Sequence, residues 1–138
     1  MKLSTLAKIF VLALVLTACG GDDPSDIAAV VSLSTTADQV AEGDMVTLTV
    51  TSDRIVSANI SVPVVYRGTA TNGSDYQSST RVIITEGTNS ANLGILIQTD
   101  EIQEGDETII VEFSDLGLPR GVTLSDQTSV TITIAGEI

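Results

Sequence analysis

Met45-Val46-Thr47-Leu48-Thr49-Val50-Thr51 alternates apolar and polar side chains without a break. Because successive side chains of a β-strand point to opposite faces, this stretch predicts a strand with its valines and leucine in a core and its threonines outside. The same period of two recurs at residues 107–113 and 129–134. We therefore expect sheets that bury one face and expose the other.

Four further runs complete this pattern, at residues 30–33, 58–66, 80–85 and 92–98. Short strands separated by turn residues, with no helical repeat of ten or more residues, predict an all-β, immunoglobulin-like antiparallel β-sandwich of about seven strands. Pro63 has no amide hydrogen, so residues 58–66 are expected to form an edge strand or to contain a bulge. The predicted core includes Val46, Leu48, Val50, Val62, Val64, Ile95, Ile109, Val111, Phe113, Val130 and Ile132.

The N-terminal segment has the features of a secretory signal peptide. Two lysines in the first eight residues precede an apolar stretch at residues 9–16. Eight helical residues rise only about 12 Å, whereas a bilayer core is about 30 Å thick, so this stretch is too short to be a membrane span. We predict that residues 1–18 are a cleaved signal peptide.

Leu16-Thr17-Ala18-Cys19 resembles the bacterial lipobox, in which the cysteine carries the lipid and becomes the first mature residue. The resemblance implies a lipid attachment at Cys19, followed by a polar tether over residues 19–27 and a domain over residues 28–138. Two or three acyl chains give stable membrane anchoring. Gly20 replaces the aspartate that retains many such lipoproteins in the inner membrane, so the expected location is the cell envelope at the outer membrane.

The chain is strongly acidic, with a net charge of −12. Cleavage of the predicted signal peptide removes both lysines and leaves four arginines against all 18 carboxylates. A surface of this charge repels nucleic acids and anionic head groups. Nucleic acid is therefore excluded as a partner, and cations or basic proteins are favoured.

Histidine and a free cysteine, on which the common activated nucleophiles depend, are not available. The chain has no histidine, and its single cysteine is assigned to the lipid. This excludes Ser–His and Cys–His nucleophiles and zinc sites built from His and Cys. Carboxylate-based hydrolysis stays open in principle, but no aromatic side chains of the kind that bind sugars accompany the carboxylates, so we expect a protein that is not an enzyme and has no small-molecule substrate.

Residues 100–107, Asp-Glu-Ile-Gln-Glu-Gly-Asp-Glu, contain five carboxylates that repel one another unless water, salt or a cation intervenes. If seven strands alternate in direction, the first, third and fifth loops and the end of the last strand meet at one end of the sandwich. That acidic end lies opposite the start of the first strand, and therefore away from the tether. The carboxylates expected there are Glu42, Asp44, Asp75, Asp100, Glu101, Glu104, Asp106, Glu107 and Glu137.

Three stretches resemble the Calx-beta domain of sodium–calcium exchangers, integrin β4 and bacterial surface proteins. They are Val40-Ala41-Glu42-Gly43-Asp44, Gly68-Thr69-Ala70-Thr71-Asn72-Gly73-Ser74-Asp75-Tyr76 and the acidic run at residues 100–107. They occur in the order and spacing of that family, and the likeness spans roughly residues 32–134. The resemblance implies an immunoglobulin-like sandwich that, in some members, binds calcium at the acidic end.

The resemblance also implies individual calcium ligands. Five carboxylates stand where calcium-binding members have them: Glu42, Asp75, Asp100, Glu104 and Glu107. Thr99 replaces a frequent acidic residue, and Ala135-Gly136-Glu137 keeps one carboxylate where those members have a run of aspartates. Since calcium takes about 6–8 oxygen ligands, these residues with carbonyls and water suffice for one weak site, not for a cluster of ions.

Structural roles compete with these assignments. Gly43, Gly73 and Gly105 are expected to permit tight turns, Asp75 to cap its own turn, and Tyr76 to pack beneath the loop. Two functional hypotheses stay open. In the first, a noncatalytic, lipid-anchored envelope module serves adhesion or scaffolding, with calcium stiffening its membrane-distal loops. In the second, a calcium-independent subunit docks onto an envelope or surface protein through a sheet edge or an apolar sheet face.

Overall fold

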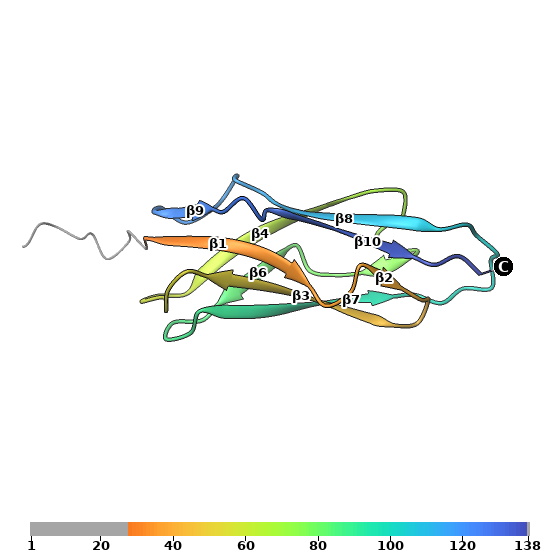
Figure 1. Ribbon diagram of the computed structural model, residues 1–138, viewed down its shortest axis with the longest axis horizontal. Coiled ribbons are helices and arrows are strands. Elements are labelled where there is room, and N and C mark those ends of the chain that lie inside the picture. The colour runs from red at the N-terminus through yellow and green to blue at the C-terminus, as the bar shows by residue number, and fades with distance from the viewer. Residues whose placement is uncertain (1–27, 138) are drawn as a thin grey trace, which may run out of the picture.

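A computed structural model describes residues 28–137, which form two packed five-stranded sheets (Figure 1). The first has the order β5-β7-β3-β1-β9 and the second the order β2-β10-β8-β4-β6. The strands are β1 (Ala29–Thr35), β2 (Gln39–Val40), β3 (Met45–Ser52), β4 (Ile60–Arg67), β5 (Tyr76–Gln77), β6 (Arg81–Ile84), β7 (Ser90–Ile97), β8 (Glu107–Phe113), β9 (Val122–Leu124) and β10 (Ser129–Ile134).

The predicted all-β, immunoglobulin-like sandwich is confirmed. Each of the seven predicted runs is a strand, displaced by no more than two residues at either end. Three short strands, β2, β5 and β9, were not predicted. Two of them pair in parallel, β9 with β1 and β2 with β10, while the other ladders are antiparallel. Across the described residues, no helix is long and apolar enough to cross a membrane.

The core lies between the two sheets and is almost entirely aliphatic. In β3, Val46, Leu48 and Val50 are fully buried, while the threonines between them are half-buried on the outer face. The other predicted core residues are also buried, except that Val130 is only partly buried against the core. The period of two in the sequence therefore identifies the inward face correctly.

Of the two alternatives predicted for Pro63, an edge strand or a bulge, the edge strand is wrong, because β4 lies between β8 and β6. The strand changes partners at this residue: Ile60 to Pro63 pair with β6, and Val64 to Arg67 pair with β8. The Pro63 carbonyl accepts a hydrogen bond from Ser114 N, just beyond the end of β8. The nitrogen of proline thus faces a place where the ladder has already ended, so no sheet hydrogen bond is lost.

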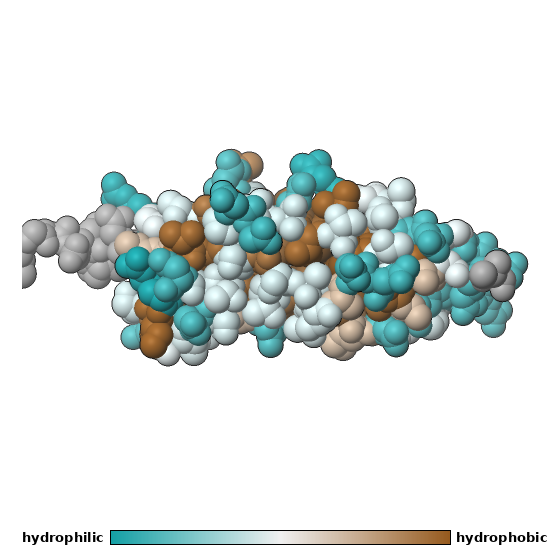
Figure 2. Space-filling model, in the orientation of Figure 1, coloured by the Kyte–Doolittle hydropathy of each residue, from teal (hydrophilic) through white to brown (hydrophobic). Residues whose placement is uncertain are grey.

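The start of β1 and the loop between β7 and β8 lie at opposite ends of the sandwich (Figure 1). The end that carries the β7–β8 loop is covered by hydrophilic residues (Figure 2). Both features agree with the expected acidic end. Cys19 and the predicted signal peptide and tether lie outside the described residues.

Candidate cation site

The acidic end contains a small hollow lined by all five predicted ligands. They are Glu42, Asp75, Asp100, Glu104 and Glu107, joined by Gln98, Gly105, Ile134, Ala135 and Gly136. The hollow has a volume of about 10 Å³, close to the minimum that holds one water molecule. No arginine or lysine is among its lining residues.

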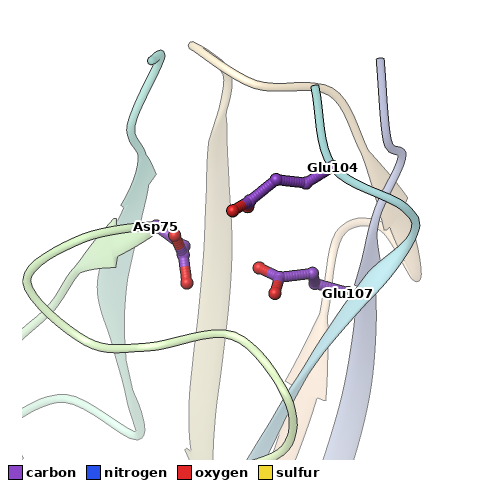
Figure 3. Close-up of side chains that lie close together, drawn as sticks. All are labelled: Asp75, Glu104 and Glu107. Carbon is purple, nitrogen blue, oxygen red and sulfur yellow. The ribbon is translucent and has the colours of Figure 1, made fainter. Parts of the chain in front are cut away.

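Asp75, Glu104 and Glu107 form the centre of this site. Each offers one carboxylate oxygen within 4.8 Å of the others. The three side chains point toward one another from the loop before β5, the β7–β8 loop and the first residue of β8 (Figure 3). Because calcium binds oxygens at about 2.3–2.6 Å, two of its ligands lie at most about 5.2 Å apart. The spacing therefore fits a single calcium ion.

Glu107 owes its place to the register of β8. It pairs with Ile134 of β10 and belongs to the same alternate set as the buried Ile109 and Val111, so its side chain is directed toward the end of the core. Burial raises the pKa of Glu107, and the negative charges of Asp75 and Glu104 raise it further. A carboxylate in these surroundings favours a proton or a cation over remaining bare.

The loop that carries Asp75 crosses the start of β8 in close contact. Ala70 N donates to the Thr108 carbonyl oxygen at 3.0 Å, and Thr108 N donates to Thr69 Oγ1 at 2.9 Å. Gly68 has φ +112°, and a Cβ there would overlap the Thr108 carbonyl oxygen. This glycine is therefore required for the contact that brings Asp75 to Glu107.

Asp75 also has the structural role expected of it. One of its carboxylate oxygens, Oδ2, accepts a hydrogen bond from Thr71 N, and its carbonyl accepts one from Gln98 N at 2.9 Å. Tyr76 is buried beneath this loop, and its ring centroid lies 5.6 Å from that of Tyr66. The turn thus fixes the Asp75 carboxylate in place through Oδ2. The hydrogen bond from Thr71 N does not involve the other oxygen, Oδ1.

The turn before β3 and the β7–β8 loop complete the site. Gly43, with φ +82°, permits the tight turn after Glu42, and its N–H donates to the Ile97 carbonyl. Asp100 Oδ1 accepts from Ile102 N at 2.8 Å, which turns the chain at the start of the acidic loop. Gly73 also has a positive φ, as expected, but Gly105 does not.

Four other carboxylates were expected at this end of the sandwich. Asp44, Glu101, Asp106 and Glu137 do not line the hollow. Asp106 Oδ1 instead accepts a hydrogen bond from Gly136 N at 2.9 Å. Gln98 was not predicted to line the site, because no charge or motif marks it in the sequence. The segment after β10 was expected at this end through Glu137, but Ala135 and Gly136 line the hollow instead.

Comparisons with known proteins identify the fold. No protein-family model and no curated protein sequence matches the chain. Among solved structures, it is similar to CBD12 from CALX1.2, with a TM-score of 0.64 and 19% identity over 77% of this chain and 44% of that one. The apo-form Calx CBD1 domain matches with a TM-score of 0.58 and 20% identity, over 78% of this chain and 98% of that domain.

A third structure, the calcium binding domain CBD12 of CALX1.1, has a TM-score of 0.58 and 22% identity over 70% of this chain and 40% of that one. The chain thus spans less than half the length of either CBD12 structure. At these identities the likeness bears on the fold alone. The described residues form a Calx-beta-like, immunoglobulin-type β-sandwich.

Proposed function

We propose that this protein is a noncatalytic binding module that takes up one calcium ion at the acidic end of its sandwich. One observation carries the proposal: Asp75, Glu104 and Glu107 come from three separate segments, yet their carboxylate oxygens lie within 4.8 Å of one another. Such convergence of like charges is unfavourable unless a cation or a proton is shared among them.

The chemistry of the lining residues favours calcium over other metals. Every side-chain donor in the hollow is an oxygen of a carboxylate or of the Gln98 amide. Hard oxygen ligands suit calcium and magnesium, and magnesium requires a near-ideal octahedron with shorter distances of about 2.0–2.1 Å. A site assembled from several separate loops adapts more easily to the larger, less demanding ion. When bound, calcium supplies positive charge that holds these loops together.

The cellular role that we propose rests on the sequence. A lipid on Cys19 anchors the protein in the bacterial outer membrane, and the sandwich begins at the end opposite the acidic loops. The calcium site then lies away from the membrane, where a partner on another envelope or surface component can reach it. Calcium in this arrangement stiffens a surface that serves adhesion or scaffolding.

Calorimetric titration of the purified protein tests calcium binding. We expect heat of binding with calcium and a rise in melting temperature in millimolar calcium that magnesium at equal ionic strength does not give. Glu104→Gln removes one ligand charge at constant size and should abolish most of the rise. Glu86→Gln, at an exposed position outside the hollow, is the matched control. An equal response to both ions would mean screening of the acidic end and no specific site.

The docking hypothesis is the second candidate, and one feature of β4 favours it. The hydrogen bond from Ser114 N to the Pro63 carbonyl shows that odd-numbered residues of β4 bond toward β8. Val64 N donates to the Thr80 carbonyl on the opposite side, where β6 has ended. Tyr66, two residues further, therefore directs its main-chain N–H and C=O to the same side, beyond the end of β6.

A groove of about 430 Å³ runs along this edge. Its walls include the side chains of Tyr66 and Tyr76. An extended peptide can add as a strand to such an edge through main-chain hydrogen bonds. On the outer face of the first sheet, the outward positions of β3 after Met45 are threonines, and Met45 forms an exposed apolar pair with Leu96 of β7. In the second sheet, Val65 of β4 and Ile83 of β6 are exposed apolar residues.

Photo-crosslinking distinguishes this candidate. Benzoylphenylalanine in place of Val65, beside the groove, should give a discrete protein adduct in the cell envelope, whereas the same group in place of Thr49 on the other sheet should not. Persistence of the adduct in a calcium chelator would support a calcium-independent subunit. Failure of both positions to give adducts would exclude the edge as a docking site.

A further inference from the structure

The chain segment that follows β10 packs directly on the acidic loop. A Cβ placed on Gly136 would overlap the Glu104 carbonyl oxygen and would lie 2.6 Å from the Gly105 carbonyl carbon and 2.9 Å from Asp106 N. These neighbours are main-chain atoms, which cannot rotate away as the end of a side chain can. The absence of a side chain at residue 136 therefore allows two stretches of backbone to touch.

A hydrogen bond reinforces this contact. Gly136 N donates to Asp106 Oδ1 at 2.9 Å, a charge-assisted bond between the main chain of one segment and the side chain of the other. The carboxylate of Asp106 is thus engaged outside the hollow. We call the Gly136–Asp106 bond, together with the backbone contact, the latch.

The latch acts on one side of the cation site. Glu107 is held by the sheet itself, since it pairs with Ile134 and the next residue, Thr108, pairs with Thr133. Glu104 lies in the loop before β8, outside any ladder. The latch is what fastens the backbone of residues 104–106 to the end of β10.

We propose that Gly136 and Asp106 are positioning residues, which hold Glu104 at the correct distance from Glu107 and Asp75 without touching the ion. This inference rests on the proposed calcium site. A ligand held in place before binding loses less conformational freedom when the ion arrives, so the affinity is higher. The latch holds the backbone of residues 104–106 in place before the ion binds, through the main-chain contact at Gly136.

Two pairs of variants test the proposal by calorimetric calcium titration of the purified protein. Gly136→Ala introduces the overlap, and Gly87→Ala is its control because residue 87 lies outside the hollow and a Cβ there meets no atom within 4 Å. Asp106→Ala removes the hydrogen bond, whereas Asp106→Asn keeps an acceptor oxygen. Loss of residues that orient metal ligands weakens affinity by about 10- to 100-fold, which we expect for Gly136→Ala and Asp106→Ala. Both controls should stay within about threefold of the wild type. Gly87→Ala lies outside the hollow, and the charge that Asp106→Asn removes is screened by solvent and salt.

Amide hydrogen exchange in a chelator supplies a measurement that does not depend on the ion. Residues 101–106 should exchange faster in Gly136→Ala and Asp106→Ala, with unchanged protection of the core strands. If Gly136→Ala fails to fold, Asp106→Ala decides the question, because it creates no overlap. Wild-type affinity in Asp106→Ala, or an equal loss in all four variants, would overturn the proposal. A wild-type protein that binds no calcium would refute the proposed function and the positioning role with it, while exchange would still show whether the latch orders the loop.

Discussion

Replacing Glu107 with glutamine should stabilise the calcium-free protein at neutral pH. The carboxylate of Glu107 is directed toward the core end of β8, and its pKa is raised by burial and by the charges of Asp75 and Glu104. Glutamine has the same size and no charge. The variant therefore removes the repulsion while the packing around residue 107 is retained.

The spacing of the carboxylates sets the size of the effect. At 4.8 Å, two unit charges repel by about 0.9 kcal/mol in bulk water and by about 3.5 kcal/mol at the effective dielectric constant of ~20 that applies near protein surfaces. Glu107 faces two such neighbours, but all three side chains keep contact with solvent and salt. We expect Glu107→Gln to raise the free energy of unfolding by about 1–3 kcal/mol, which corresponds to several degrees in melting temperature.

The effect of pH has a defined sign. Because the folded-state pKa of Glu107 lies above its ordinary value of 4.5, the native state binds more protons than the unfolded state between the two values. The destabilisation is complete above the folded-state pKa and disappears as the pH falls toward 4.5. The advantage of Glu107→Gln should therefore be present at pH 7 and vanish near pH 4.

Calcium should reverse the order of stability. At 1,000-fold excess over the dissociation constant, binding adds about 4.1 kcal/mol to the wild type. This gain exceeds the advantage of about 1–3 kcal/mol expected for Glu107→Gln in chelator, and the variant gains less from calcium because a ligand is missing. Melting curves in a chelator and in calcium, at pH 4 and pH 7, measure both effects, with Glu86→Gln as the control. A variant less stable than the wild type in chelator at pH 7 would refute the claim that these carboxylates repel one another.

Three further predictions concern the core, a loop contact and the anchor. Leu48→Ala should cost about 2–5 kcal/mol in chemical denaturation because its side chain is fully buried, whereas Thr47→Ala on the outer face should cost under about 1 kcal/mol; equal losses would contradict the register of β3. Gly68→Ala should destabilise by about 1–3 kcal/mol or more, since φ is +112° and the added Cβ overlaps the Thr108 carbonyl; an unchanged melting temperature would exclude that close approach. Cys19→Ala should release the protein from membranes or stall its processing, and an unmodified thiol in the mass spectrum of the wild type would disprove lipidation.

The sequence predicts the long strands because each has a buried face that repeats every second residue. The strands β2, β5 and β9 escape prediction for the same reason. They contain two or three residues each, too few for any period, and their pairing depends on neighbours far away in the chain. The edge position expected from Pro63 fails because β4 exchanges one partner for another at that residue.

The gathering of the five carboxylates also follows from the sequence, since alternating strands bring the first, third and fifth loops to one end. The distances between the carboxylates depend on main-chain contacts, and the residue types in the sequence give little indication of such contacts. Gly136 is an example: its sequence signal is a single glycine, and its meaning comes from the main chain of residues 104–106 packed against it. Gly105, expected to permit a turn, has neither a positive φ nor a close neighbour.

Glu107 belongs both to the core-facing side of β8 and to the candidate site, and the alternation of apolar residues in the sequence already places it on that side. Every second residue of β8, from Glu107 to Phe113, points to the same side of the strand. The first of these residues is a carboxylate, and the other three are buried and apolar. A strand position at the end of the core costs stability when it carries a bare charge. A cation shared with Asp75 and Glu104 offsets that cost only in the folded state, because these three residues lie in separate segments of the chain. The proposed calcium site therefore predicts that ion binding and folding at this end are coupled through Glu107. The same carboxylate that is expected to weaken the calcium-free sandwich would add to the stability of a calcium-bound one.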